Sequence, residues 1–136
     1  MKDKASALVT LEKEGEVSLV CLNDRDSFNS LSENLLKELF DTLKQADEDD
    51  STKVLVLRGS GRGFSAGHNL KEVQKNENES FYRELLTCSK KVMTFLPNLN
   101  KPVIAEVHGV ATAAGCQLVA ACDLAYADTN TRFATP

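Results

Sequence analysis

A short apolar run, a loop of small residues and a helix start follow one another twice in this sequence, and this unit limits the possible folds. Val54–Leu57 leads into a loop rich in Gly, Ser and Ala, after which a helix is predicted to begin at Asn69. Val103–Val107 leads into a second such loop and a predicted helix over Cys116–Cys122. Strands that are apolar on both faces and alternate with helices are typical of a parallel sheet in an α/β fold.

The first 30 residues predict a β-hairpin followed by a polar loop. Ala7–Leu11 and Val17–Leu22 alternate between apolar and polar residues, and the polar turn Glu12–Glu16 contains Gly15, which tolerates a positive φ. The polar stretch Asn23–Asn29 then separates the hairpin from the first helix.

Two longer helices are predicted outside the repeated unit. Ser30 and Glu33 match the S-x-x-E capping box at the start of the first helix. Its apolar residues recur at helical spacing and comprise Leu31, Leu35, Leu36, Leu39, Phe40 and Leu43. This helix is expected to end near the acidic run Asp47–Asp50, interpreted as a solvated surface, and the other helix is predicted over Ser80–Leu96.

Length and charge favour one soluble domain over residues 1–136 and exclude several classes of partner. The net charge is −4 and the basic residues form no stripe, which argues against binding to nucleic acid. No apolar run reaches the ~20 residues that a membrane span needs. The charged start of the chain resembles neither a signal nor a transit peptide. We therefore expect a cytoplasmic protein, or a mitochondrial matrix protein if a transit peptide has been removed.

The cysteines and histidines give no sign of a disulfide framework or a metal site. The cysteines lack C-x-x-C spacing and are expected to be reduced and buried; they are Cys21, Cys88, Cys116 and Cys122. With two histidines and no Cys/His cluster, neither a metal nor another cofactor is expected.

The last residues suggest that the domain is incomplete. Arg132–Pro136 follow an apparent strand, and no helix comes after them to cover the sheet edge. We expect the strands at residues 103–107 and 124–127 to expose apolar surface and to make the chain prone to association.

The two small-residue loops are the candidate functional site. Both leave the carboxyl ends of predicted parallel strands, where ligands bind in open α/β sheets. Small residues allow close approach of backbone to ligand, and a helix N-terminus offers free amides. Two such loops facing one crevice could form an oxyanion hole, in which amides stabilise negative charge on one oxygen. The alternative is that the Gly and Ala residues only form turns and allow helices to pack.

These loops carry a resemblance to a known family. Gly63–Leu70 and Val107–Leu118 resemble the two thioester-binding loops of the crotonase (enoyl-CoA hydratase/isomerase) superfamily, and Leu22–Leu31 is similar to its early coenzyme A loop. The resemblance implies a crotonase-like spiral of ββα units and an acyl-CoA substrate from fatty acid metabolism. It also implies no separate cofactor, and a homotrimer or a hexamer made of two trimers.

The resemblance assigns roles to individual residues. The oxyanion-hole amides fall on His68, whose imidazole is expected to be solvated, and on Ala114. Asp26 lies where the family commonly has a basic residue, so Arg25 is a possible substitute for a phosphate contact. The implied substrate-binding residues are Ser27, Phe28, Arg62, Ala66, Gly67, Leu70 and Lys71.

Gln117 is the main departure from the family pattern. It lies where hydratases have a catalytic glutamate, and a carboxamide cannot act as a general base near neutral pH. The second glutamate of the family would fall just after Pro136. The sequence therefore leaves two functions open: an enoyl-CoA hydratase/isomerase-like lyase or isomerase with weak or no hydratase activity, and a non-catalytic acyl-CoA-binding or regulatory subunit.

A third and weaker alternative is a serine hydrolase, because Gly63–Gly67 also fits the nucleophile-elbow pattern G-x-S-x-G around Ser65. Residues 59–62 separate this motif from its strand, and a triad in the order Ser, Asp/Glu, His would have to end at His108. His108 is expected to be a turn residue, as is Asp123, the only carboxylate near the second loop.

The first prediction follows from this comparison. A serine-directed fluorophosphonate should leave Ser65 unlabelled, because no Ser–Asp–His arrangement is available to activate its hydroxyl. Intact-protein mass spectrometry would measure the label, with a known serine hydrolase as the positive control. Stoichiometric labelling of Ser65 would support the hydrolase alternative.

Overall fold

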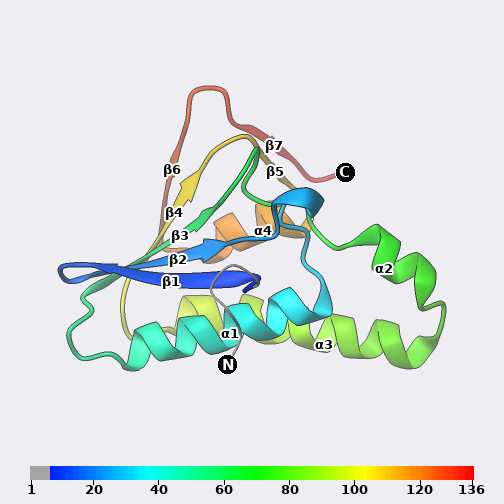
Figure 1. The fold of residues 1–136 in the computed structure, drawn as a ribbon, viewed down its shortest axis with the longest axis horizontal. Helices are drawn as coiled ribbons and strands as arrows, with labels where there is room; N and C mark the ends of the chain where they lie inside the picture. The colour runs from blue at the N-terminus through cyan, green and yellow to red at the C-terminus, as the bar shows by residue number, and fades with distance from the viewer. Residues whose placement is uncertain (1–6) are drawn as a thin grey trace.

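The computed structural model describes residues 7–136 and contains one main sheet with helices packed on it (Figure 1). The sheet has the strand order β1-β2-β3-β4-β6, with β1 antiparallel to β2 and all other neighbours parallel. Its strands are β1 (Val9–Glu14), β2 (Val17–Leu22), β3 (Val54–Gly59), β4 (Val103–Val107) and β6 (Leu124–Ala127). The predicted α/β class with a parallel sheet is confirmed.

The hairpin has a longer first strand and a tighter turn than predicted. β1 covers Val9–Glu14 instead of Ala7–Leu11, and its register pairs Glu14 directly with Val17. Gly15 adopts φ +60°, which permits a two-residue turn, so the polar residues 12–14 remain in the strand. Backbone pairing and turn geometry therefore outweigh the polarity of these side chains.

Helices α1 (Glu33–Glu48) and α3 (Glu79–Phe95) lie side by side against the sheet (Figure 1). The rings of Phe40 and Phe95 meet across them with centroids 4.6 Å apart. α3 begins and ends one residue earlier than predicted, because Asn78 accepts the amide of Phe81 as its N-cap. The residues that α1 buries are Leu35, Leu36, Leu39, Leu43 and Ala46.

The N-cap of α1 is Ser32 and not Ser30. The Ser32 hydroxyl accepts a hydrogen bond from the Leu35 amide at 3.2 Å. Leu31 lies outside the helix, where its amide donates to the Gly67 carbonyl at 2.6 Å in an isolated bridge between residues 31 and 68. The extended backbone that this bridge requires delays the helix by two residues.

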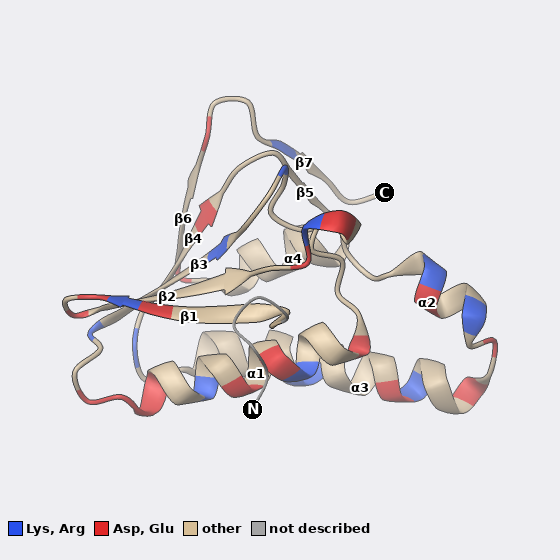
Figure 2. Cartoon of the chain, viewed as in Figure 1, with Lys and Arg blue, Asp and Glu red and all other residues tan. Residues whose placement is uncertain are grey.

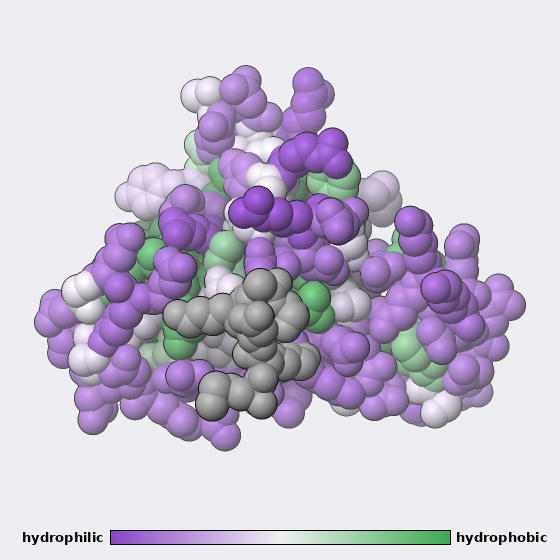
Figure 3. Space-filling model, viewed as in Figure 1, coloured by the Kyte–Doolittle hydropathy of each residue, from purple (hydrophilic) through white to green (hydrophobic). Residues whose placement is uncertain are grey.

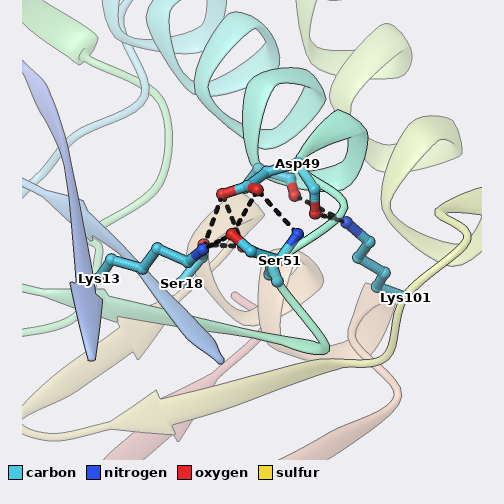
Figure 4. A network of polar contacts seen from close by, with 7 residues as sticks. Lys13, Ser18, Asp49, Ser51 and Lys101 are labelled. Atoms are coloured by element: carbon cyan, nitrogen blue, oxygen red, sulfur yellow. Dashed lines mark hydrogen bonds and ion pairs between the residues drawn. The ribbon is translucent and has the colours of Figure 1, made fainter. Parts of the chain in front are cut away.

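The acidic run after α1 is partly structural. The Asp49 carboxylate accepts hydrogen bonds from Ser51 and pairs with Lys13 at 3.0 Å, while Lys101 donates to the Asp49 carbonyl (Figure 4). The hydrogen bonds from Ser51, followed by that from Lys13, hold the pKa of Asp49 well below its usual range. This network fastens the turn after α1 to the hairpin at the end of the sheet opposite the small-residue loops.

The surface is mostly charged and polar. Lys and Arg alternate with Asp and Glu along the helices, and the face in Figure 3 carries only scattered apolar patches (Figures 2 and 3). No helix within residues 7–136 has the length and apolar character to cross a membrane. The four cysteines are free thiols, but they are half-buried instead of fully buried as predicted.

One sheet edge exposes apolar side chains. Leu124 and Tyr126 of β6 are 60% and 69% exposed, as predicted for residues 124–127. The same expectation for residues 103–107 is wrong, because Val103, Ala105 and Val107 are buried. β4 lies between β3 and β6, so both of its edges are paired and its side chains enter the core.

The second prediction tests the position of the helix cap. Replacing Ser32 with Ala should lower the free energy of unfolding by about 1 kcal/mol, because the Leu35 amide loses its acceptor. Urea unfolding followed by circular dichroism would measure the change. A loss for Ser30→Ala with none for Ser32→Ala would restore the capping box expected from the sequence.

Candidate active site

The two small-residue loops are in direct contact. Ser65 and Ala111 form a parallel bridge, in which the Ser65 amide donates to the Val110 carbonyl and the Thr112 amide donates to the Ser65 carbonyl, each at 3.1 Å. The second loop contains strand β5 (Val110–Thr112), which pairs with β7 (Arg132–Ala134). Sequence reasoning missed β5 because its three residues lie within a run of small residues.

Glycines make the contact between these loops possible. A Cβ at Gly67, where φ is +91°, would lie 3.1 Å from the Thr112 carbonyl oxygen and 3.3 Å from the Ala114 amide nitrogen. A Cβ at Gly115 would lie only 2.3 Å from the Ser65 carbonyl oxygen, a distance that real side chains do not reach. The first loop therefore lies against the start of the helix that follows the second loop.

That helix, α4 (Ala114–Ala121), begins without a side-chain cap and two residues earlier than predicted. Its N-cap residue Ala113 has φ 52° and ψ −123°, a region that is costly for a residue with a Cβ. The Ala113 amide donates to the Ala134 carbonyl of β7 at 2.8 Å, which holds this backbone in place. As the first helical residue, Ala114 has an amide without an intrahelical acceptor.

The His68 amide lies at the corresponding point of the first loop. His68 follows Gly67 and precedes Asn69, the N-cap of α2 (Leu70–Lys75), whose side chain accepts the Glu72 amide at 3.1 Å. Among the loop backbone hydrogen bonds of residues 7–136, none has the His68 amide as donor. The structure thus places two free amides, those of His68 and Ala114, on loops that touch at Gly67.

A groove of about 510 Å³ lies beside the first loop. It runs between this loop and the early segment that includes the short 3-10 helix η2 (Arg25–Ser27). None of its lining residues comes from the second loop, which contacts the first loop at Ser65 and Gly67. The lining residues are Asp24, Asp26, Ser27, Phe28, Ser30, Ala66, His68, Asn69, Leu70 and Lys71.

Most residues that the resemblance assigned to substrate binding line this groove. Two do not: Gly67 packs against the second loop, and Arg62 stacks its guanidinium over the Phe28 ring at 4.7 Å. Lys71 is an exposed cation of the lining, whereas Asp24 and Asp26 add negative charge. The cations closest to this groove are therefore Lys71, in its lining, and Arg62, beside Phe28.

Asn29 anchors the early segment and was not identified from the sequence. It is fully buried with φ 52°, a left-handed conformation that Asn tolerates better than most residues. Its side chain accepts the Asp24 amide at 2.8 Å and donates to the carbonyls of Ser60 and Gly63 at 2.9 and 3.0 Å. One carboxamide thus joins the early segment to the start of the first loop.

Ser65 completes this connection instead of acting as a nucleophile. Its hydroxyl is buried, donates to the Asn29 carbonyl at 2.8 Å and accepts the Gly67 amide at 3.3 Å. A nucleophilic serine needs an exposed hydroxyl beside a general base. These contacts argue against the serine hydrolase alternative.

The remaining candidate side chains have clear positions. Gln117 is exposed in the first turn of α4. His108 donates from Nε2 to the Gly61 carbonyl at 2.7 Å, and the Asp123 carboxylate accepts the Val103 amide at 2.8 Å, as expected for turn residues. His68 is partly exposed, and the Nδ1 of its imidazole is buried. Within residues 7–136, no group of His, Cys, Asp and Glu is suited to holding a metal ion.

The family model for enoyl-CoA hydratase/isomerase matches residues 12–136. The chain belongs to this enoyl-CoA hydratase/isomerase family, the crotonase superfamily.

Curated relatives and solved structures agree with this assignment. Enoyl-CoA hydratase domain-containing protein 3, mitochondrial, from Xenopus laevis is 40% identical over 95% of this chain and 44% of its own length. Short-chain-enoyl-CoA hydratase from Clostridium acetobutylicum is 36% identical over 94% of this chain and 49% of its own length.

The crystal structure of human enoyl-CoA hydratase domain-containing protein 3 superimposes with a TM-score of 0.91 at 35% identity, over 96% of this chain and 51% of that chain. That of a Mycobacterium smegmatis enoyl-CoA hydratase gives 0.90 at 42% identity, over 94% of this chain and 50% of that chain. The chain spans about half the length of these relatives.

The third prediction concerns the Asn29 anchor. Replacing Asn29 with Ala should lower the free energy of unfolding by about 2–4 kcal/mol, because one buried and two partly buried backbone groups lose their partner. Urea unfolding would measure this loss. Asn98→Ala is the matched control, since the Asn98 side chain makes one exposed hydrogen bond to Thr94, and its effect should stay within about 0.5 kcal/mol. Equal effects of the two substitutions would contradict the anchoring role.

Proposed function

We propose that the protein binds an acyl-CoA thioester and holds its carbonyl oxygen between the His68 and Ala114 amides. The contact between the two loops at Gly67 carries this proposal, because it brings a free loop amide beside the free first amide of a helix. Fixed amide donors stabilise the negative charge that develops on a thioester oxygen, and losing one such donor typically costs about 10²–10³ in rate.

The coenzyme A part of the ligand would occupy the groove along the early segment. The groove is lined by residues from segments 24–30 and 66–71. Lys71 in its lining and Arg62 beside Phe28 would supply the cations for the phosphate groups of coenzyme A. Asp26 opposes a phosphate contact at its own position. Arg25 lies against Gly61, where an added Cβ would be 3.1 Å from the Arg25 Cγ.

The chemistry that follows thioester binding depends on the residue at position 117. Gln117 extends from the first turn of α4, one turn from the Ala114 amide, and offers hydrogen bonding without basicity. We infer that the protein is an enoyl-CoA hydratase/isomerase-like lyase or isomerase with weak hydration of enoyl-CoA. The same residue supports the second candidate function, a non-catalytic acyl-CoA-binding or regulatory subunit.

Location and assembly follow from the same proposal. Relatives named as mitochondrial support a site of action in mitochondria. The exposed Leu124, Tyr126 and Phe133 support self-association, and a homotrimer or a hexamer is the assembly proposed.

The fourth prediction tests Gln117 directly. The wild-type protein in its full-length form should hydrate crotonyl-CoA poorly, because general-base catalysis typically contributes about 10²–10⁴-fold to the rate. Gln117→Glu should raise this rate only in a chain that also contains the second family carboxylate. The measurement is the loss of enoyl-thioester absorbance.

Gln45→Glu is the matched control for this experiment. Gln45 is exposed on α1, so the same change of charge there should leave the rate unaltered. Wild-type turnover of ~10 s⁻¹ or more, a rate typical of metabolic enzymes, would show that another group acts as the base. Binding of crotonyl-CoA without turnover in either protein would favour the non-catalytic alternative.

A further inference from the structure

The main sheet carries apolar side chains on both of its faces, and the helices α1 and α3 lie along only one of them (Figure 1). Side chains alternate between the two faces of a strand. The core face includes the cross-strand neighbours Val20, Leu57 and Ala105, together with the apolar side chains that α1, α3 and α4 bury. The strand residues between them belong to the opposite surface, here called the outer face, and are not part of that core. Its apolar members are Val17, Leu19, Val54, Val56, Ile104, Leu124 and Tyr126.

The register of the strands arranges this outer face in rows. Four direct neighbours on β2, β3, β4 and β6 form an apolar row, which consists of Leu19, Val56, Ile104 and Leu124. The next row toward the carboxyl ends of the same strands consists of Cys21, Arg58, Glu106 and Tyr126. Parallel strands are normally covered on both faces, and an apolar row outside the core is typical of an interaction surface.

Both rows are self-complementary about a line between β3 and β4. A two-fold axis along this line, in the plane of the contact, lays β3 of one copy over β4 of a second copy, and β2 over β6. Val56 then faces Ile104 of the second copy, because the two residues are in register within one sheet. Arg58 faces Glu106 of the second copy for the same reason. The apolar row meets an apolar row, and each charge meets the opposite charge.

We propose that the outer face is a two-fold interface between two copies of this chain, packed sheet against sheet. The charges favour a second copy as the occupant. Within one chain the Arg58 Nη1 lies 3.8 Å from the Glu106 Oε2, a long contact between partly exposed groups that stabilises the fold little. Across the axis each group gains a second opposite charge, and the interface contains two such crossed pairs. The axis also keeps paired strands in the same direction, within the angle of about 30° that aligned sheets adopt.

This interface goes beyond the proposed function, because it needs no ligand. A two-fold contact joins two equal units, whether each unit is a single chain or an assembly held by other surfaces. Its loss therefore halves the mass of the particle in either case.

The test reverses the two charges separately and then mixes the variants. Arg58→Glu places like charges opposite each other at both crossed pairs, and so does Glu106→Arg. Each variant should therefore associate about tenfold or more weakly than wild type. An equimolar mixture should restore the wild-type mass, because one chain then offers two carboxylates and the other two guanidinium groups. Sedimentation velocity over a range of concentrations would measure these masses.

Arg83→Glu and Glu79→Arg are the matched controls. They reverse the charges of an exposed ion pair on α3, which packs on the core face of the sheet. Neither variant should change the mass, alone or in the mixture. Circular dichroism would show whether all four variants are folded.

Alkylation of cysteines gives an independent readout. Cys21 faces Tyr126 of the second copy in this interface, whereas Cys88 lies on α3 and packs against the core. After brief treatment with iodoacetamide, peptide mass spectrometry should find Cys21 protected at concentrations where wild type associates. Arg58→Glu should remove this protection, and Cys88 should react equally in both proteins.

Two outcomes would overturn the interface. Equal masses for wild type and both outer-face variants would show that copies of the chain do not meet through this face. A mixture of folded Arg58→Glu and Glu106→Arg chains that keeps the lower mass would show that the occupant is not a second copy.

Discussion

The contact between the Ser65 and Ala111 segments is the interaction on which the rest of the site depends. Each loop leaves the carboxyl end of a parallel strand, and the sheet alone brings the two loops only into the same region. The backbone hydrogen bonds between residues 65 and 110–112 then fix their relative position, and Gly67 and Gly115 remove the side chains that would hold them apart. The buried Asn29 side chain connects the early segment to the start of the first loop by hydrogen bonds. Groove, loop amides and helix start are therefore parts of one hydrogen-bonded unit.

The parallel sheet and both small-residue loops could be predicted from the sequence, because hydrophobic patterning and strand order determine them. Asn69 and Asp123 were also assigned correctly, since N-caps and turns depend on a few neighbouring residues. The errors have a common origin in contacts between distant residues. Ser32 displaces Ser30 as the cap because Leu31 is held by Gly67, and β5 exists because β7 pairs with it. Asn29 was missed because a single Asn in a polar loop does not reveal which carbonyls surround it.

The proposed thioester binding and the proton transfer that catalysis would need depend on different groups. In the proposed function the amides of His68 and Ala114 need no ionisable group, so polarising a carbonyl would depend on backbone geometry alone. Proton transfer needs a base, and the exposed Gln117 supplies only a dipole. Burial raises the pKa of the Cys122 thiol, at the C-terminal end of α4, to about 12, so this thiol stays protonated near neutral pH and supplies no base. The proposed thioester binding therefore needs only backbone amides, whereas hydration would need a base that Gln117 does not supply.

The conformation of Ala113 has a consequence for the proposed oxyanion hole. Its backbone, at φ 52°, lies in a costly region, and the amide of Ala113 donates to the Ala134 carbonyl of β7. The Ala114 amide belongs to the peptide group that follows Ala113, so its direction depends on the dihedral angles of Ala113. The short ladder between β5 and β7 therefore helps to hold Ala113 in this costly conformation. Without this pairing we expect Ala113 to relax to an ordinary conformation and the Ala114 amide to change direction. In the proposed function the direction of one amide of the site would therefore depend on three exposed residues of β7, far along the chain from the first loop.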